Sequence, residues 1–194
     1  MSMIEILLAV ALGLALAAAV GLRVFVPLLV VAVAARMGNF ELSPALAWIT
    51  TTPAVVTFAI AAVVEVAAYY LPGVDNLLDL LMTPLALVAG TLVMVAPLWE
   101  LPPLVKWTVA IVAGGGAAGI TQGLSTVLRA KSTVGTAGLG NPLIATGELG
   151  GALLISIVAL LVPVLALVCV VVLLVWLLRR WRRASARPEV DART

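Results

Sequence analysis

The sequence is poor in charge, and this decides which solvent can surround the folded chain. Only 10% of its 194 residues are charged, whereas 64% are hydrophobic. Soluble domains usually have about 25% charged residues and about half apolar ones. So few charges cannot cover a surface that faces water. We therefore expect lipid to be the solvent for most of the chain.

Histidine is absent, and the only cysteine is Cys169. The absence of histidine removes the commonest catalytic base and the commonest transition-metal ligand. A single cysteine cannot form an internal disulfide bond. These absences disfavour zinc, haem and Ser-His-Asp chemistry. We expect no cofactor and do not expect an enzyme.

Long apolar runs predict an all-α fold, a polytopic transmembrane helix bundle. A helix needs about 20 apolar residues to cross a bilayer. The sequence has five such runs, at residues 6–35, 54–71, 76–96, 104–120 and 149–178. We expect about five spans in a single transmembrane domain, residues 1–178, and a basic tail, residues 179–194.

Glycine and proline interrupt the first and last runs. Gly21, Arg23 and Pro27 favour a span that ends near Leu22, then a break and a shorter second element, with a single kinked helix as the alternative. Pro163 predicts a kink in the last run. Residues 121–147 are rich in Gly, Ser and Thr. We expect either a solvated loop there or a re-entrant segment that is buried or lines a cavity.

Two dipeptides recur at an offset of 102 residues and suggest a weak inverted repeat. Gly21-Leu22 recurs as Gly123-Leu124, and Gly38-Asn39 recurs as Gly140-Asn141. Three predicted spans separate the copies, which would give them opposite orientations. Inverted repeats with interrupted helices are typical of transporters. Chance recurrence in a Gly-rich chain is the alternative.

The basic residues are concentrated at the C-terminus. Six of the eleven lie within residues 179–194, directly after the last apolar run. Basic residues beside a span mark its cytoplasmic end, so we expect a cytoplasmic C-terminus and, with five spans, an N-terminus outside. The tail could also bind anionic membrane lipids, and a role in topology alone is the alternative. A basic patch against a membrane does not point to nucleic acid.

Arg23 and Glu65 are charges inside predicted apolar runs. Each costs about 3 kcal/mol on insertion scales and is expected to face a partner or a water-filled cavity. Glu65 shares its helix face with small residues such as Ala62, which favours an internal position. It is a candidate proton or cation site. A structural ion pair with Arg23 or Arg129 is the alternative.

Asp75, Asn76 and Asp79 lie at the predicted start of a helix. Carboxylates there cap the helix and suit its dipole. The alternative is a magnesium site of a lipid-modifying enzyme, because the two aspartates, four apart, share a helix face. Intramembrane prenyltransferases use such motifs in pairs, and this chain has one copy.

A third polar group lies in residues 121–148. It contains Arg129, Lys131, Ser132, Asn141 within Gly138–Pro142, and Glu148. Two cations beside hydroxyl donors and glycine amides could hold an anion. Flexible glycines in a solvated loop are the alternative.

Several of these segments together resemble a bacterial family of small polytopic membrane proteins known only as a domain of unknown function. The matching pieces are Gly21-Leu22-Arg23, Pro72–Asn76 with Asp79, Lys131–Thr133, and Gly138–Pro142 followed by Glu148. The resemblance covers roughly residues 5–160. It implies a multi-pass protein of the bacterial inner membrane and supplies no substrate.

Three functional hypotheses follow. The leading one is a small transporter or channel for a small solute or ion, which forms a homo-oligomer. Its pathway would be lined by Arg23, Glu65, Asp75, Asn76, Asp79, Arg129, Lys131, Ser132, Asn141 and Glu148. A non-catalytic scaffold or assembly protein is the second, and it predicts that the buried charges pair off without a hydrated cavity. The third is the magnesium-dependent enzyme.

Overall fold

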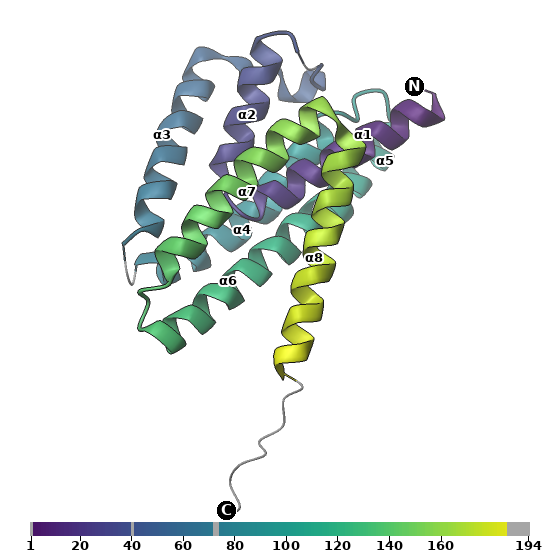
Figure 1. Cartoon of the computed structure of the whole chain (residues 1–194). Helices are drawn as coiled ribbons and strands as arrows, with labels where there is room; N and C mark the ends of the chain where they lie inside the picture. The colour runs from purple at the N-terminus through teal and green to yellow at the C-terminus, as the bar shows by residue number, and fades with distance from the viewer. Residues whose placement is uncertain (1, 40, 72–73, 186–194) are drawn as a thin grey trace, which may run out of the picture.

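The computed structural model describes residues 2–39, 41–71 and 74–185, without the side chains of Asn76 and of most residues after 172. In this part of the chain all regular structure is helical (Figure 1). The helices are α1 (Met3–Val20), α2 (Phe25–Arg36), the 3-10 helix η1 (Pro44–Thr50), α3 (Thr52–Tyr69), α4 (Val74–Val95), α5 (Pro103–Val109), the π-helix η2 (Ala110–Gly115), α6 (Gly116–Thr136), α7 (Asn141–Leu161) and α8 (Pro163–Ser185).

Five helical stretches of the described chain are long and apolar enough to cross a membrane, as the sequence predicted. They are Met3–Val20, Thr52–Tyr69, Leu77–Val95, Pro103–Thr136 and Asn141–Leu161. Large apolar side chains cover the outside of the bundle; Leu80, for example, is 71% exposed. Charged side chains such as Arg23 and Arg129 are buried inside. This distribution is the reverse of that in a water-soluble protein and suits a multi-pass membrane protein.

The first apolar run forms two helices, which confirms the predicted break and excludes the single kinked helix. α1 is the core helix: residues 15–20 are almost completely buried, and α1 packs against α4, α6, α7 and α8. At Gly21 the chain turns back into α2 (Figure 1). A Cβ atom on Gly21 would lie 2.6 Å from the Thr121 Cβ and 2.9 Å from the Gln122 amide nitrogen. Glycine therefore lets the end of α1 contact α6.

α2 has 12 residues and begins inside the bundle. Twelve helical residues extend about 18 Å, less than the roughly 30 Å of a hydrocarbon core. The backbone of the α1–α2 break is covered by protein, since Val20, Arg23 and Val24 are at most 2% exposed. Non-helical backbone at membrane depth requires such cover.

The segment 121–147 is neither a solvated loop nor an irregular re-entrant segment, so that expectation is wrong. α5, η2 and α6 form one continuous helix, Pro103–Thr136, and α7 follows after a short turn. The hydroxyl groups do not break α6, because several of them donate to the carbonyl four residues earlier; Thr133, for example, donates to Arg129 over 3.0 Å. Four polar residues of α6 instead face the interior of the bundle: Thr121, Gln122, Ser125 and Arg129.

The turn between α6 and α7 depends on two residues with left-handed backbone conformations. Ala137 has φ of 51° and Gly138 has φ of 86°. Glycine adopts this conformation without steric cost, whereas alanine does not. Pro142 lies in the first turn of α7, where its missing N–H group is not needed.

Pro163 breaks the last apolar run instead of kinking it. α7 ends at Leu161 and α8 begins at Pro163, and the chain reverses direction between them (Figure 1). Val162 has φ of −143° and ψ of 80°, outside the helical region. A residue before proline is driven from the helical region by contact with the proline ring.

The recurring dipeptides do not occupy equivalent places in the fold. Gly21-Leu22 lies at the α1–α2 break, whereas Gly123-Leu124 lies inside α6. Gly38-Asn39 follows α2, whereas Gly140-Asn141 begins α7. The helix order therefore gives this repeat no support.

Candidate functional site

Five charged side chains from different helices converge inside the bundle. We call them the ion cluster: Arg23, Glu65, Asp79, Arg129 and Glu148. Each is at most 7% exposed. They come from the α1–α2 break, α3, α4, α6 and α7, so the cluster joins five parts of the chain.

Arg129 connects α6 to both α4 and α7. Its Nε donates to Asp79 Oδ2 over 3.1 Å, and its Nη2 donates to Asp79 Oδ1 over 2.7 Å. Its Nη1 donates to Glu148 Oε2. Two parallel bonds to one carboxylate are the strongest geometry that a guanidinium offers. Arg129 is therefore held in one orientation.

Glu148 is shared by the two arginines. Arg23 Nη1 lies 3.1 Å from Glu148 Oε2, the oxygen that also accepts from Arg129. Ser125 Oγ donates to the other oxygen, Oε1. Arg23 Nη2 donates to the carbonyl of Ala145 over 3.1 Å. A single carboxylate oxygen thus connects the α1–α2 break to α6.

Tyr69, at the end of α3, contacts both arginines and one aspartate. Its hydroxyl donates to Asp79 Oδ1 over 3.0 Å. The guanidinium carbons of Arg23 and Arg129 lie 3.9 and 4.3 Å from the centre of its ring. A cation at this distance is attracted by the negative face of the ring. Tyr69 therefore supports the cluster through both its ring and its hydroxyl.

Glu65 binds backbone groups at the start of α2. Its Oε1 accepts from the amide of Val24 over 2.8 Å, and its Oε2 accepts from the amide of Phe25 over 3.0 Å. The first amides of a helix have no partner within the helix, and they carry partial positive charge. These two bonds show that Glu65 caps α2. The ion pair with Arg23 or Arg129, one of the two roles that the sequence suggested for Glu65, does not form among the described side chains.

A second polar layer lies one turn farther out. Asn141 Nδ2 donates to Asp75 Oδ2 and, over 2.9 Å, to Thr133 Oγ1. Asp75 and Asn141 begin α4 and α7, and Thr133 lies in the last turn of α6. These helix ends meet at one end of the bundle (Figure 1). The polar groups therefore continue from that end inward to the α1–α2 break.

Two of the polar groups at the break have no hydrogen-bond partner. Arg23 Nε and Gln122 Nε2 are buried N–H donors without an acceptor, and both side chains are 1% exposed. Buried donors are rarely left unpaired in proteins. Arg23, a member of the ion cluster, and the nearby residue Gln122 thus each offer a hydrogen bond that the described chain does not fill.

The sequence analysis missed Tyr69, Ser125 and Gln122 as site residues. A signal was present: Tyr69 lies four residues after Glu65, and Ser125 lies four residues before Arg129, spacings that share a helix face. Gln122 extends the same face of α6 by one more turn. We could not use this signal in α6 because we expected a loop there.

Two further predicted site residues, Lys131 and Ser132, are not among the five residues of the ion cluster. Lys131 is exposed, and Ser132 lies by the α6–α7 turn with its Oγ 3.5 Å from Thr136 Oγ1. The side chain of Asn76 lies outside the described residues, as does the structure of the chain beyond Ser185.

The aspartates proposed as magnesium ligands have protein partners. Asp79 accepts from Arg129 and Tyr69, and Asp75 accepts from Asn141. In the described part of the chain, no group of three or more Asp, Glu, Cys or His side chains could hold a metal ion. The geometry gives the magnesium hypothesis no support.

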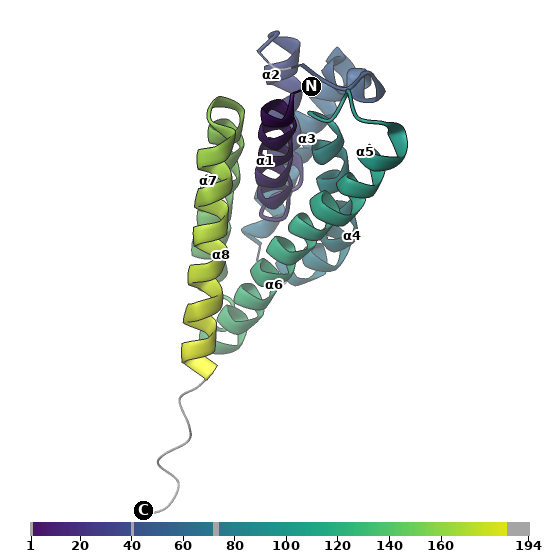
Figure 2. The same cartoon turned by 90° about the vertical axis from the view of Figure 1, so that its right-hand side faces the viewer.

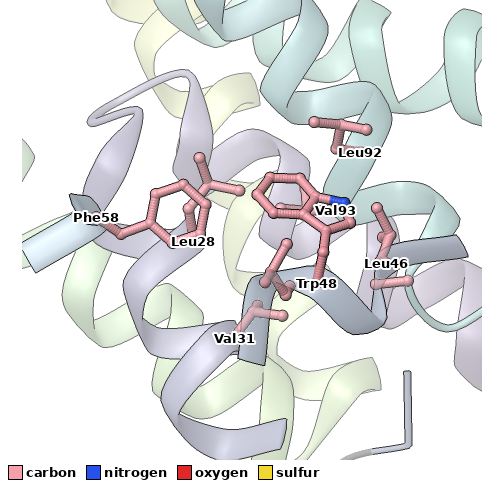
Figure 3. A pocket seen from close by; sticks show the side chains of 9 residues that line it. Leu28, Val31, Leu46, Trp48, Phe58, Leu92 and Val93 are labelled. Carbon is pink, nitrogen blue, oxygen red and sulfur yellow. The ribbon is translucent and has the colours of Figure 1, made fainter. Parts of the chain in front are cut away.

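Neither of the two cavities described here is lined by the ion cluster. A cavity of about 50 Å³ lies between α2, η1, α3 and α4, and its walls are apolar and aromatic (Figure 3). The rings of Trp48 and Phe58, two of its lining residues, lie 6.1 Å apart. A more open groove of about 400 Å³ lies between α2 and the end of α7, lined by residues such as Val33 and Leu160.

The ion cluster bears on two of the functional hypotheses. The gathering of its five charged side chains in one place agrees with the transport hypothesis. The pairing of these charges with one another agrees with the scaffold hypothesis.

Comparison with known proteins places the chain in a family. A family model described as a domain of unknown function (DUF4126) matches residues 10–183. The chain belongs to the DUF4126 family. The match confirms the resemblance to a family of unknown function, and it includes every residue of the ion cluster. No curated protein and no solved structure matches this DUF4126 chain.

Proposed function

We propose that the protein is a small membrane transporter or channel for a small solute or ion, with the ion cluster in its pathway. The observation that carries this proposal is the burial of five charged side chains, four of which are joined in ion pairs through Arg129 and Glu148. Ionisable groups at membrane depth are costly, and they commonly mark solute or ion pathways. Stability alone explains them poorly, because apolar packing is often as stable as a buried ion pair.

The arrangement of the polar groups supports the same function. They extend from the ends of α4, α6 and α7 to the α1–α2 break, where Arg23 and Gln122 retain unpaired donors. Interrupted helices that end at a buried polar site are typical of transporters. The polar groups reach one end of the bundle. On the other side of the α1–α2 break the packing is apolar, with Leu16 and Met94 in buried hydrophobic clusters. This suits a closed state that alternates with an open one.

The orientation follows from the basic residues of the C-terminus. We infer a bacterial inner-membrane protein with a cytoplasmic C-terminus. The described end of α8 lies at the same end of the bundle as the α6–α7 turn, in both views (Figures 1 and 2). The end of the bundle that these polar groups reach would then face the cytoplasm. We also propose a homo-oligomer as the working unit.

Reconstitution tests this function directly. We would seal the purified protein in liposomes and follow the flux of protons, potassium and chloride with a pH-sensitive dye and ion electrodes. For an ion that crosses, we expect Glu148→Gln to slow the flux about tenfold or more, which corresponds to about 1.4 kcal/mol. Glu41→Gln is the matched control, since Glu41 is exposed outside the helices. Equal flux in both variants would remove Glu148 from the pathway.

A scaffold or assembly protein is the second candidate, and the pairing of Asp79 and Glu148 with the two arginines favours it. It predicts that the wild type conducts none of the tested ions. It also predicts a stoichiometric membrane partner that co-purifies with the wild type and is lost when the cluster is disrupted.

A further inference from the structure

The carboxylate oxygens of Asp79 and Glu148 differ in their partners. Both oxygens of Asp79 accept from Arg129, over 3.1 and 2.7 Å. Glu148 Oε2 also accepts from Arg129, and it lies 3.1 Å from Arg23 Nη1. The partner of Glu148 Oε1 is instead the hydroxyl group of Ser125. Among the described side chains, Oε1 is therefore the one oxygen of these four that faces a neutral group and no guanidinium.

Ser125 does not make the bond that other buried hydroxyl groups of these helices make. Thr121 and Ser156 each donate to the carbonyl four residues earlier, over 2.9 and 2.6 Å. Ser125 Oγ donates across to Glu148 on α7. Serine in a helix can bond to the carbonyl four residues earlier, which for Ser125 is that of Thr121. The Ser125 hydroxyl therefore has two alternative acceptors.

These two acceptors allow Glu148 to be paired in both of its protonation states. A hydroxyl group donates one hydrogen bond and also accepts. When Glu148 is ionised, Ser125 donates to Oε1. When Oε1 carries a proton, the acid donates to Ser125 Oγ, and the hydroxyl hydrogen turns to the Thr121 carbonyl. Neither state leaves a buried donor unpaired, so the cost of an unpaired buried group is avoided.

The charge and the exposure of the ion cluster favour uptake of a proton at Glu148. Its three carboxylates exceed its two guanidinium groups by one, so one added proton brings the total charge to zero. Glu148 is 7% exposed, whereas the other four members are at most 3% exposed. Glu148 is therefore the member that a proton from water reaches most directly.

The charged groups that face Glu148 come from the cluster itself. Arg23 and Arg129 contact it, and Asp79 shares Arg129 with it. α7 also packs against α1, α2, α3 and α8. The ionisable side chains of α3 are those of Glu65, which caps α2, of Tyr69, which bonds to Asp79, and of the half-exposed Tyr70, which bonds to Thr146. Those described in α1, α2 and α8 are all exposed: Glu5, Arg36, Cys169 and Arg179.

A proton suits this site better than a larger ion. A metal cation needs several oxygen ligands, and three of the four oxygens of Asp79 and Glu148 already accept from guanidinium groups. A larger anion would have to displace a carboxylate from Arg23 or Arg129. A proton needs one lone pair of a single oxygen, which Glu148 Oε1 offers.

We propose that Glu148 Oε1 and the Ser125 hydroxyl form a reversible proton-binding site, and that the proton is the ion that the pathway carries. Buried carboxylates are the groups with which membrane proteins relay protons. Proton binding depends only on the contacts of Glu148. The passage of the proton through the membrane rests on the proposed transport function.

Infrared difference spectroscopy tests proton binding. We would compare the purified protein in acidic and alkaline buffer, in detergent, and follow the C=O bands of protonated carboxylic acids. We expect the wild type to show a band that Glu148→Gln lacks. Glu41→Gln is the matched control, since Glu41 is exposed outside the helices, and it should retain that band. If no band depends on Glu148, the proposal is overturned.

Ser125→Ala tests the same site with Glu148 in place. It retains both arginine contacts of Glu148 and removes only the partner of Oε1, so we expect the Glu148 band to shift. Ser156→Ala is the matched control, because Ser156 is also buried but donates to Ala152 within α7, and its bands should stay at the wild-type positions. If Glu148→Gln does not fold, this pair decides: unshifted acid bands in Ser125→Ala would overturn the proposal.

Proton flux into liposomes separates this inference from transport in general. We would impose a pH gradient, dissipate the voltage with potassium and valinomycin, and follow an enclosed pH-sensitive dye. We expect Ser125→Ala to slow the proton flux about threefold, the effect of one neutral hydrogen bond, and Ser156→Ala to leave it unchanged. Without valinomycin, potassium and chloride flux should equal that of protein-free liposomes.

The failure of the proton site and the failure of transport give different results. Potassium or chloride flux that Glu148→Gln slows, without proton flux, would overturn the proton assignment and leave transport standing. A Glu148 band without flux of any ion would support the proton-binding site and refute transport.

Discussion

Arg129 and Asp79 form a two-bond pair that joins α6 to α4 inside the bundle, with distances of 3.1 and 2.7 Å. Both side chains are at most 4% exposed. Breaking a buried pair leaves a charge without its partner. We expect Asp79→Asn to lower the free energy of unfolding by about 3–5 kcal/mol, measured by denaturant unfolding in detergent micelles.

A double-mutant cycle would isolate this pair. Arg129→Gln alone should also destabilise, whereas Asp79→Asn with Arg129→Gln should lose at least about 1 kcal/mol less than the sum of the single losses. Strict additivity would mean that the two side chains do not interact in the folded protein.

Tyr69 stabilises the cluster through two separable contacts. Tyr69→Phe removes only the hydroxyl that donates to Asp79, so we expect a loss of about 1 kcal/mol in the free energy of unfolding. Tyr69→Leu also removes the ring beneath both guanidinium groups and should cost about 1–3 kcal/mol more. Thermal unfolding of the two variants side by side measures the difference. Equal losses would show that the ring contacts contribute nothing.

Gly21 lets α1 end against α6, so a side chain there should separate the two helices. A Cβ atom would lie 2.6 Å from the Thr121 Cβ. We expect Gly21→Ala to lower the free energy of unfolding by about 1–3 kcal/mol, the usual cost of overpacking. The matched control is Gly123→Ala, since a Cβ there meets no atom within 4 Å. If both variants unfold at the same temperature, the close contact is not important.

The turn between α6 and α7 contains a strained alanine. Ala137 has φ of 51°, a conformation that costs a residue with a Cβ atom about 1–2 kcal/mol. We expect Ala137→Gly to raise the free energy of unfolding by about 0.5–1 kcal/mol, because glycine relieves this strain but gains freedom in the unfolded chain. Gly138→Ala should have the opposite effect, since Gly138 has φ of 86°. Thermal unfolding measures both, and destabilisation by Ala137→Gly would contradict this account of the turn.

The sequence was reliable where the length and polarity of a segment decide the structure. Apolar length alone predicted the number of long spans, and Gly21 with Pro27 predicted the break after α1. It was unreliable in residues 121–147, where Gly, Ser and Thr favour a loop in water. Packing of α6 against α1 and α4 outweighs that local preference. Pro163 by itself predicted that the helix is disturbed there. Whether the chain only kinks or, as observed, starts a new helix in another direction depends on where α8 packs.

The sequence by itself determined a helical membrane protein, because so few charges and such long apolar runs leave no other solvent. It also identified Arg23 and Glu65 as internal, since a charged residue in an apolar run has to face a partner or a cavity. Only the tertiary structure decided which partners those charges have. Glu65 binds amides of α2 that lie 40 and 41 residues away in sequence. Glu148 is shared by Arg129, 19 residues away, and by the still more distant Arg23. These contacts form through the packing of separate helices, which no local pattern encodes.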